Sequence, residues 1–389
     1  MHDFVIYGSG ISAKIFALAV ARSGYTISFI SDVKKNSSNK NTDLVTFLSH
    51  GSIEYLSSLM SDSKKLNDFE EITNINCELE KNYRNGSQKV NFKSNENNLG
   101  RIIKNSTLEE LINKEIEIYD NIYLIENRCP LEFINNRENV KILFENGDPL
   151  HAKICVVSST KKNKIFKDLN IDVIEQNLEQ TALSIKVKVK RKNKNCAYQR
   201  FTPDGPLAFL PYFHNEASIV WSIKDHSKIL KLQDYEIRNL IQQKLKDYVE
   251  ELDFQKIEKH KLNFRYTKKL YDKNFLLIGN IAHNIHPIAG QGLNLSIKDI
   301  ALFSKTITKY TNIGYNINDQ ILLSNFNQDR KLDNTAYSFG TFFIDEVFSS
   351  NNKVINFFSS QGVRWVQKNK LIKNFFVNNA TGKSFFNTL

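Results

Sequence analysis

The sequence predicts a mixed α/β (α+β) fold in which an α/β unit opens the chain, a β-rich region interrupts it, and the unit is completed before a helical C-terminal region. Three observations predict this arrangement. A strand, a glycine loop, a helix and a second strand fill residues 4–30, alternating strands dominate from about residue 180, and a strand, a glycine-bearing loop and a helix return at 275–303. We therefore expect an interleaved two-domain arrangement.

The opening unit is a βαβ pattern. Phe4 to Ile6 form a short apolar strand, and Gly8-Ser9-Gly10 precedes a helix over Ile11 to Arg22. Gly24 ends that helix, as expected of a glycine just past a helix C-terminus, and Thr26 to Ile30 form a second strand.

The rest of the chain is expected to alternate between sheet and helix. We predict a loop at 33–50, a helix at 53–59, sheet-like patches within 62–98, a helix from 107, and a hairpin at 140–157. In the β-rich region we predict strands at 182–189, 207–212, 218–223 and 264–270, and an amphipathic helix at 232–252. We predict an α/β domain at 1–180, a β-rich domain at 181–270, and the return of the α/β domain with C-terminal helices at 271–389. Residues 60–98 belong either to the first domain or to the β-rich one.

The C-terminal helical region has an aromatic-rich face. This face could serve in helix packing, as a surface for a partner protein, or as a patch that faces a membrane, and the sequence leaves all three roles open. Its residues are Phe339, Phe342, Phe343, Phe348, Phe357 and Phe358.

Composition excludes several classes of protein. The 389 residues are 41% hydrophobic and 24% charged, as in ordinary globular proteins, and contain no apolar run of about 18 residues. The N-terminus enters a strand directly, so no signal peptide is expected, and the four scattered cysteines predict reduced thiols in a cytoplasm. The net charge of +11 comes from dispersed lysines, which argues against nucleic-acid binding and leaves weak attraction to the inner face of the cytoplasmic membrane.

The first motif indicates a dinucleotide. Gly8, Gly10 and Ala13 match G-x-G-x-x-(G/A), in which the glycines allow a tight turn and close approach of a pyrophosphate, and the small third residue allows helix–strand packing. The acidic residue that usually binds the ribose is replaced by Ser31, 23 positions after Gly8. Asp32 follows, and two interpretations of this residue stay open: it binds the ribose in place of Ser31, or it is a solvated turn residue.

The second motif lies at 279–295. An apolar strand at 275–278 leads through Gly279-Asn280 and a loop with Pro287 into Gly290-Gln291-Gly292-Leu293-Asn294, where a helix begins. Backbone N–H groups and the positive end of a helix dipole therefore meet at one point, which suits the anionic edge of a cofactor.

Six stretches together resemble the ubiquinone-biosynthesis flavin monooxygenases (the UbiH/UbiF/UbiI type) of the class A aromatic hydroxylases. They are the two motifs and the segments 43–49, 99–103, 195–211 and 220–222. The resemblance implies a Rossmann-like FAD-binding domain interleaved with a β-sheet substrate domain. It also implies an enzyme that uses NAD(P)H and molecular oxygen to hydroxylate a polyprenylated phenol, with a quinone-biosynthesis complex as an expected partner.

The resemblance also assigns residues. The N-terminal glycines and the 279–294 loop would bind FAD, with Gly290-Gln291-Gly292 facing the pyrimidine edge of the flavin. Tyr198, Phe201 and Pro206 would line a substrate cavity, although aromatic strand residues are commonly core. No catalytic side chain or metal cluster is assigned, and a positioned loop histidine is the favoured interpretation of His283 and His286.

Several positions depart from the family pattern. An aspartate that contacts the FAD ribitol is Asn280 here, an Asp-Gly pair is Ser159-Thr160, and a flavin-contacting arginine is replaced around Val45-Thr46. These changes, with Ser31, support an alternative hypothesis. The chain would then be a non-catalytic homologue that binds an isoprenoid substrate or scaffolds a biosynthetic complex. A flavin reductase or dehydrogenase on the same scaffold is a third hypothesis.

Overall fold

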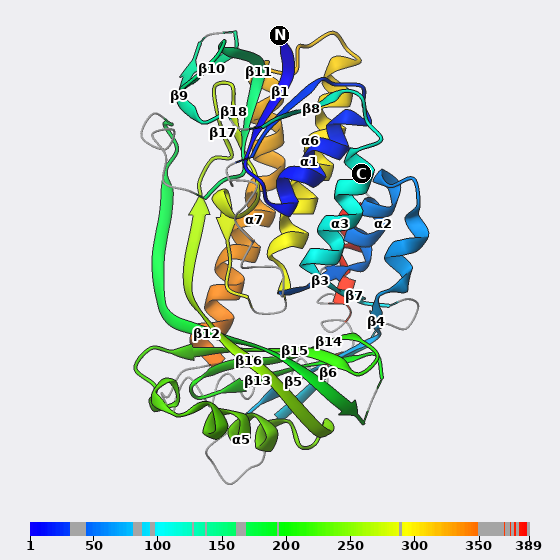
Figure 1. Ribbon diagram of the computed structural model, residues 1–389, viewed down its shortest axis with the longest axis vertical. Helices are drawn as coiled ribbons and strands as arrows, with labels where there is room; N and C mark the ends of the chain where they lie inside the picture. Colours follow the sequence, from blue (N-terminus) through cyan, green and yellow to red (C-terminus); the bar gives the residue numbers. More distant parts are fainter. Residues whose placement is uncertain are drawn as a thin grey trace.

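The computed structural model describes residues 1–31, 44–80, 88–93, 98–126, 128–136, 138–160, 169–192, 194–287 and 290–348, together with 369, 374, 377–378 and 381–386. The molecule is elongated, with an α/β part above and a broad sheet below in Figure 1. Two long strands, β12 (Val173–Arg191) and β16 (Val249–Thr267), run from the lower sheet up to the α/β part.

The α/β part is built on an eight-stranded sheet with the order β17-β18-β11-β1-β2-β8, to which β10 and β9 are added beside β11. From β18 to β8 the neighbours are all parallel. Its strands are β1 (His2–Tyr7), β2 (Ile27–Ile30), β8 (Ile122–Ile125), β9 (Pro130–Asn135), β10 (Val140–Phe144), β11 (Leu150–Val157), β17 (Tyr271–Asp272) and β18 (Phe275–Leu277). The central strands read as apolar runs because both faces are covered.

Four helices pack on or near this sheet. They are α1 (Ile11–Ala21), α3 (Asn105–Ile116), α6 (Gly292–Thr311) and α7 (Gln320–Phe348). Phe303 of α6 lies at the centre of an aromatic cluster, with its ring centroid 6.3 Å from Phe4, 5.4 Å from Phe16 and 5.2 Å from Phe326. This cluster fixes α1, α6 and α7 relative to β1, and with them the two glycine loops.

The lower sheet has the order β19-β16-β12-β15-β14-β13-β5-β6. Its other strands are β5 (Asn74–Leu79), β6 (Gln88–Lys93), β13 (Cys196–Thr202), β14 (Gly205–Phe213), β15 (Glu216–Lys224) and β19 (His283–Asn284). One face packs on α5 (Asp234–Leu245) and the other faces the α/β part (Figure 1). Because side chains alternate along a strand, each strand contributes to both layers.

A small third sheet, β3 (Val45–Ser49), β7 (Gly100–Lys104) and β4 (Glu70–Ile72), lies between these parts. Phe47, Ile72 and Ile102 of this sheet pack against Ala197 and Tyr212 of the lower one. The short elements nearby are α2 (His50–Leu59), η1 (Ser63–Asp68) and α10 (Lys383–Phe386), and the remaining ones are η2 (Lys228–Lys231) and η3 (Gly279–Ile281).

The predicted fold class is confirmed, and three element predictions are wrong. The expected loop at 33–50 ends in β3, because pairing with β7 supplies backbone hydrogen bonds that the local pattern does not reveal. The helix predicted at 232–252 ends at Leu245, and the strand predicted at 264–270 is the end of β16, which has 19 residues. Pairing with β12 makes this region a strand. The spacing of Leu252 and Ile257 alone fits the hydrophobic period of a helix as well as that of a strand.

No helix in the described ranges is both long and apolar enough to cross a membrane.

The domain boundaries predicted from the sequence can be compared with the ends of the strands. The boundary at 180 falls inside β12, the one at 270 falls between β16 and β17, and β5 and β6 belong to the lower sheet.

Candidate functional site

Four positions that the sequence connects with the cofactor follow parallel strands at their carboxyl ends. Gly8 follows β1, Ser31 follows β2, Ser159 lies just after β11, and Gly279 lies just after β18. The chain passes from β1 to β2 on one side, while β11 lies on the other side of β1. Such a switch point at the carboxyl edge is where open α/β sheets bind ligands.

The first glycine loop combines a crowded position with an open one. Gly8 has φ +138°, and a Cβ there would lie 2.9 Å from backbone atoms of Ser158 and Ser159, so a side chain is excluded. A Cβ at Gly10 would meet nothing within 4 Å. Gly10 caps α1, where the first turn has no side-chain cap and no acidic residue. The N–H groups that begin α1 therefore face space suited to an anionic group.

The second loop touches the first. Gly279 has φ +72°, and a Cβ there would lie 3.0 Å from the Ser12 Cβ in the first turn of α1. Asn280, the next residue, is exposed, and so is Pro287 further along the loop. Two motifs that lie about 270 residues apart in the sequence thus form one surface.

The start of α6 repeats the arrangement found at α1. Gln291 is the N-cap without a side-chain cap bond, and the first turn holds no acidic residue. A Cβ on Gly292 would meet nothing within 4 Å, whereas Gly290, at φ +60°, lies against Phe47. The two helix starts and the two open glycines fit FAD, which carries an anionic pyrophosphate and an electron-rich flavin edge.

Asn294 takes part in the fold of this loop. Its Nδ2 donates to the Phe47 carbonyl oxygen at 2.7 Å, and its Oδ1 accepts from the Ser49 N–H at 2.8 Å. The predicted cofactor-binding side chain is therefore engaged with the backbone of β3. Leu293 is half-buried and packs on the core of the α/β part, and Ala13 is fully buried.

The altered contact positions lie around the same edge. Ser31 and Thr160 are exposed and Ser159 is buried. Val45 and Thr46 lie on β3, where the Thr46 hydroxyl donates to Asn105 at 2.5 Å. Asp32 lies outside the described residues.

The candidate substrate residues lie on opposite faces of the lower sheet. Phe201 and Pro206 are cross-strand partners, and Phe201 packs against Ile344 and Phe348 of α7 on the face toward the α/β part. Tyr198 lies on the face toward α5, with its ring centroid 4.0 Å from that of Tyr248. Tyr198 therefore does not share a cavity wall with the other two.

Both loop histidines are buried in polar networks that join the second loop to α7. His283 Nε2 lies 2.5 Å from Asp299 Oδ2, and Arg330 donates to Asp299 at 2.6 Å. Burial would raise the pKa of Asp299, but Arg330 and His283 outweigh it and lower the pKa to about 2. His286 bonds to Gln180, which donates to Asp345 at 2.6 Å.

Asp299, Arg330 and Asp345 were not predicted from the sequence. A usable signal existed for Asp299 and Arg330, since each is a charged residue within an otherwise buried helical stripe. Fully buried charges are rare unless they are paired.

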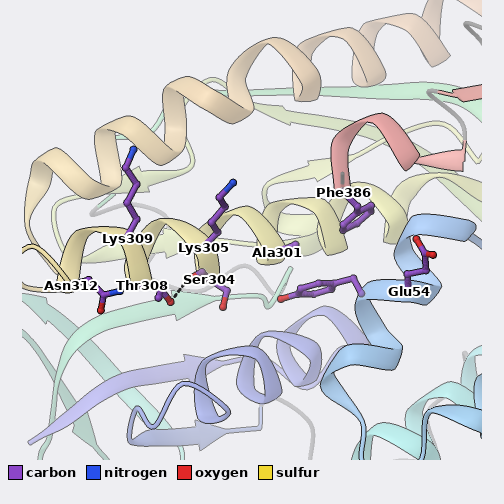
Figure 2. Close-up of a pocket in the computed structure, with 9 residues that line it drawn as sticks. Glu54, Ala301, Ser304, Lys305, Thr308, Lys309, Asn312 and Phe386 are labelled. Carbon is purple, nitrogen blue, oxygen red and sulfur yellow. Dashed lines mark hydrogen bonds between the residues drawn. The ribbon is translucent and has the colours of Figure 1, made fainter. Parts of the chain in front are cut away.

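A groove of about 590 Å³ lies elsewhere, along α6 (Figure 2). Glu54 of α2, Phe386 of α10, and Lys305 and Lys309 of α6 line it. None of the predicted cofactor residues borders this groove. The glycine loops at the carboxyl edge therefore define the candidate site.

Comparisons with known proteins bear on the cofactor and the fold. The sequence profile of a family described as an FAD binding domain matches residues 162–320. The 3-demethoxyubiquinol 3-hydroxylase of Escherichia coli (strain K12) is 23% identical over 278 residues, covering 71% of each chain. The mitochondrial ubiquinone biosynthesis monooxygenase COQ6 of Dictyostelium discoideum is 22% identical over 462 aligned positions, covering 99% of this chain and 92% of that one. The chain is thus similar to ubiquinone-biosynthesis monooxygenases, at low identity, and matches an FAD-binding family over part of its length.

A solved structure extends the likeness to the whole fold. The p-nitrophenol 4-monooxygenase PnpA from Pseudomonas putida DLL-E4 superposes with a TM-score of 0.76 at 10% identity, covering 100% of this chain and 98% of that one. These similarities confirm the resemblance found in the sequence and the prediction of FAD as cofactor. The roles of individual residues stay predictions.

Proposed function

We propose that this protein is an FAD-dependent monooxygenase that hydroxylates the aromatic ring of a polyprenylated phenol in ubiquinone biosynthesis, with NAD(P)H and molecular oxygen as co-substrates. The observation that carries the proposal is the surface formed by the two glycine loops at the carboxyl edge. Gly279 of the second loop lies against Ser12 in the first turn of α1. Both α1 and α6 start without a side-chain cap, at the open positions Gly10 and Gly292. The named activities of the homologues supply the reaction class.

FAD, when bound, supplies electron transfer from NAD(P)H and the activation of oxygen. We assign the pyrophosphate to Gly8, Gly10 and Ala13, where the first turn of α1 offers N–H groups. Gly290, Gln291 and Gly292 would hold the pyrimidine edge through the start of α6, where negative charge develops on reduction.

The sugar contacts are weaker in this chain than the family pattern implies. We assign the ribitol to exposed Asn280, which offers an amide in place of a carboxylate, and the ribose to Ser31. Both residues retain hydrogen-bonding groups without charge.

We place the phenol between the second glycine loop and the face of the lower sheet that carries Phe201 and Pro206. Phe201 packs with the end of α7, so this region is bounded by the lower sheet, α7 and the loop. Apolar walls suit a prenylated ring and exclude water from the reaction.

The test is expression in a host that lacks its own ubiquinone-pathway hydroxylase. The purified protein is expected to be yellow, to restore quinone synthesis, and to incorporate label from isotopic molecular oxygen into the product. A flavin-loaded protein whose product carries no label would point to a reductase or dehydrogenase instead.

A second candidate is a non-catalytic homologue that binds the isoprenoid substrate or scaffolds the biosynthetic complex. The absence of acidic groups at Asn280 and Ser31 favours it. Restored oxygen-dependent hydroxylation would exclude this candidate. Retained prenylphenol binding, with no flavin binding and no rescue by Asn280→Asp, would support it.

We further propose that the protein works in the cytoplasm at the inner face of the membrane, where its lipid-tailed substrate resides. Exposed Leu332, Phe339 and Phe343 on α7 support a peripheral apolar contact. Flotation with anionic vesicles tests this contact, and co-purification with other quinone-biosynthesis enzymes tests membership of a complex.

A further inference from the structure

His286 presents a buried nitrogen for which the described residues supply no hydrogen-bond partner. Its side chain is 1% exposed, its Nε2 lies 2.8 Å from Gln180 Oε1, and its Nδ1 has no hydrogen-bond partner within the described part of the chain. Unsatisfied buried polar atoms are uncommon and costly in native proteins. The atom therefore needs an explanation.

The neighbours of His286 fix which of its nitrogens carries the proton. Asp345 Oδ2 accepts a hydrogen bond from Gln180 Nε2 at 2.6 Å. The Gln180 amide must then turn its oxygen toward His286, so His286 Nε2 carries the proton and donates. Burial lowers the pKa of His286 despite the opposing influence of Asp345, which favours the neutral ring. Nδ1 consequently holds a lone pair and acts as an acceptor.

The position of His286 suits a substrate contact. It precedes exposed Pro287 in the second glycine loop, a short distance in sequence before the start of α6. Its network reaches Asp345 on α7, beside Ile344, which packs on Phe201 of the lower sheet. The lower sheet, α7 and the second glycine loop, which enclose the proposed phenol region, therefore meet at this side chain.

We propose that His286 Nδ1 accepts a hydrogen bond from the hydroxyl group of the phenol substrate, and that Gln180 and Asp345 hold His286 in the acceptor tautomer. This inference rests on the proposed function. The hydrogen bond fixes the orientation of the ring relative to the flavin and selects free phenols over their ethers. His286 is then a substrate-recognition residue, and Gln180 is a positioning residue.

Binding to the FAD-loaded protein tests the proposal without turnover. The probes are 2-prenylphenol and its methyl ether, and dissociation constants are measured by equilibrium dialysis in the absence of NAD(P)H. Wild type is expected to bind the phenol about tenfold more tightly than the ether, since the ether leaves the acceptor unpaired. His286→Phe should lose the preference, and His286→Gln, which keeps a donor and an acceptor, should retain part of it. Gln180→Leu should weaken the preference.

Nitrogen NMR of wild-type protein labelled at histidine needs no variant. It should show Nδ1 without a proton, and its resonance should move on addition of the phenol and stay in place with the ether. A protonated Nδ1, an equal affinity of wild type for both probes, or an unchanged preference in folded His286→Phe would overturn the inference. If FAD-loaded wild type binds neither probe, the proposed function itself fails.

Discussion

Asn294 at the start of α6 holds the backbone of Phe47 in β3, donating from Nδ2 to the carbonyl oxygen at 2.7 Å. Its Oδ1 accepts from the Ser49 N–H at 2.8 Å, so one amide satisfies two buried backbone groups about 245 residues away in the chain. The second glycine loop is thereby fixed to the small third sheet, which itself packs on the lower sheet.

Asn294→Leu should therefore destabilise the protein and loosen this loop. Two buried backbone groups lose their partner, and we expect a loss of about 2–4 kcal/mol in the free energy of unfolding. Urea denaturation measures it. Lys305→Ala, at an exposed position on the same helix, is the matched control and should change stability little. Equal stability of both variants would contradict the role of Asn294.

Gly10→Val should abolish FAD binding while leaving the protein folded. The backbone at Gly10 is extended and a Cβ there meets nothing, so the fold accepts a side chain at a cost of about 1 kcal/mol for the helix cap. The valine would fill the space assigned to the pyrophosphate, and we expect affinity for FAD to fall by about a hundredfold or more.

Flavin fluorescence quenching measures that affinity. Gly340→Ala, in the interior of α7 with open space around its Cβ, is the control. It should leave FAD affinity unchanged and stabilise the protein by about 0.5–1 kcal/mol. Undiminished FAD binding by folded Gly10→Val would show that the pyrophosphate lies elsewhere.

The buried Asp299–Arg330 pair should make stability fall in acid. The pKa of Asp299 is lowered from 3.8 to about 2 in the folded protein, so its contribution is present above pH 3.8 and is lost as pH falls through about 2. Linkage gives a loss of about 1 kcal/mol between pH 7 and pH 3 from this group.

Asp299→Asn should therefore be strongly destabilising at pH 7, and its deficit relative to wild type should shrink by about 1 kcal/mol at pH 3. Urea unfolding at both pH values measures this difference. Asp329→Asn, at an exposed position of α7, is the control. A deficit that stays constant with pH would be inconsistent with the lowered pKa.

Asn280→Asp should strengthen FAD binding. Asn280 is exposed beside Gly279, where the family pattern has an aspartate, and a carboxylate makes stronger hydrogen bonds to hydroxyl groups than an amide does. We expect a gain of about 1 kcal/mol, or roughly fivefold in affinity. Calorimetric titration measures it, and weaker binding by the variant would remove Asn280 from the ribitol site.

The local parts of the site could be predicted from the sequence. Gly8 and Gly279 are required by positive φ angles and by close neighbours, and such positions leave clear motifs. The βαβ opening and the return near residue 275 were also predictable, because buried parallel strands are short apolar runs next to glycine loops.

The non-local parts could not be predicted. Strand β16 becomes a strand through its pairing with β12, and the face on which Tyr198 lies depends on the packing of α5. Arg330 is placed by a partner on another helix, so its role depends on tertiary structure. Such features follow from contacts between segments far apart in the chain.

The most direct test of the account is a titration of the purified protein with FAD, followed by its absorption spectrum. We expect saturable binding of one FAD per chain, with the flavin bands shifted from those of free FAD. A spectrum identical to the sum of protein and free FAD, both for wild type and for Asn280→Asp, would contradict it.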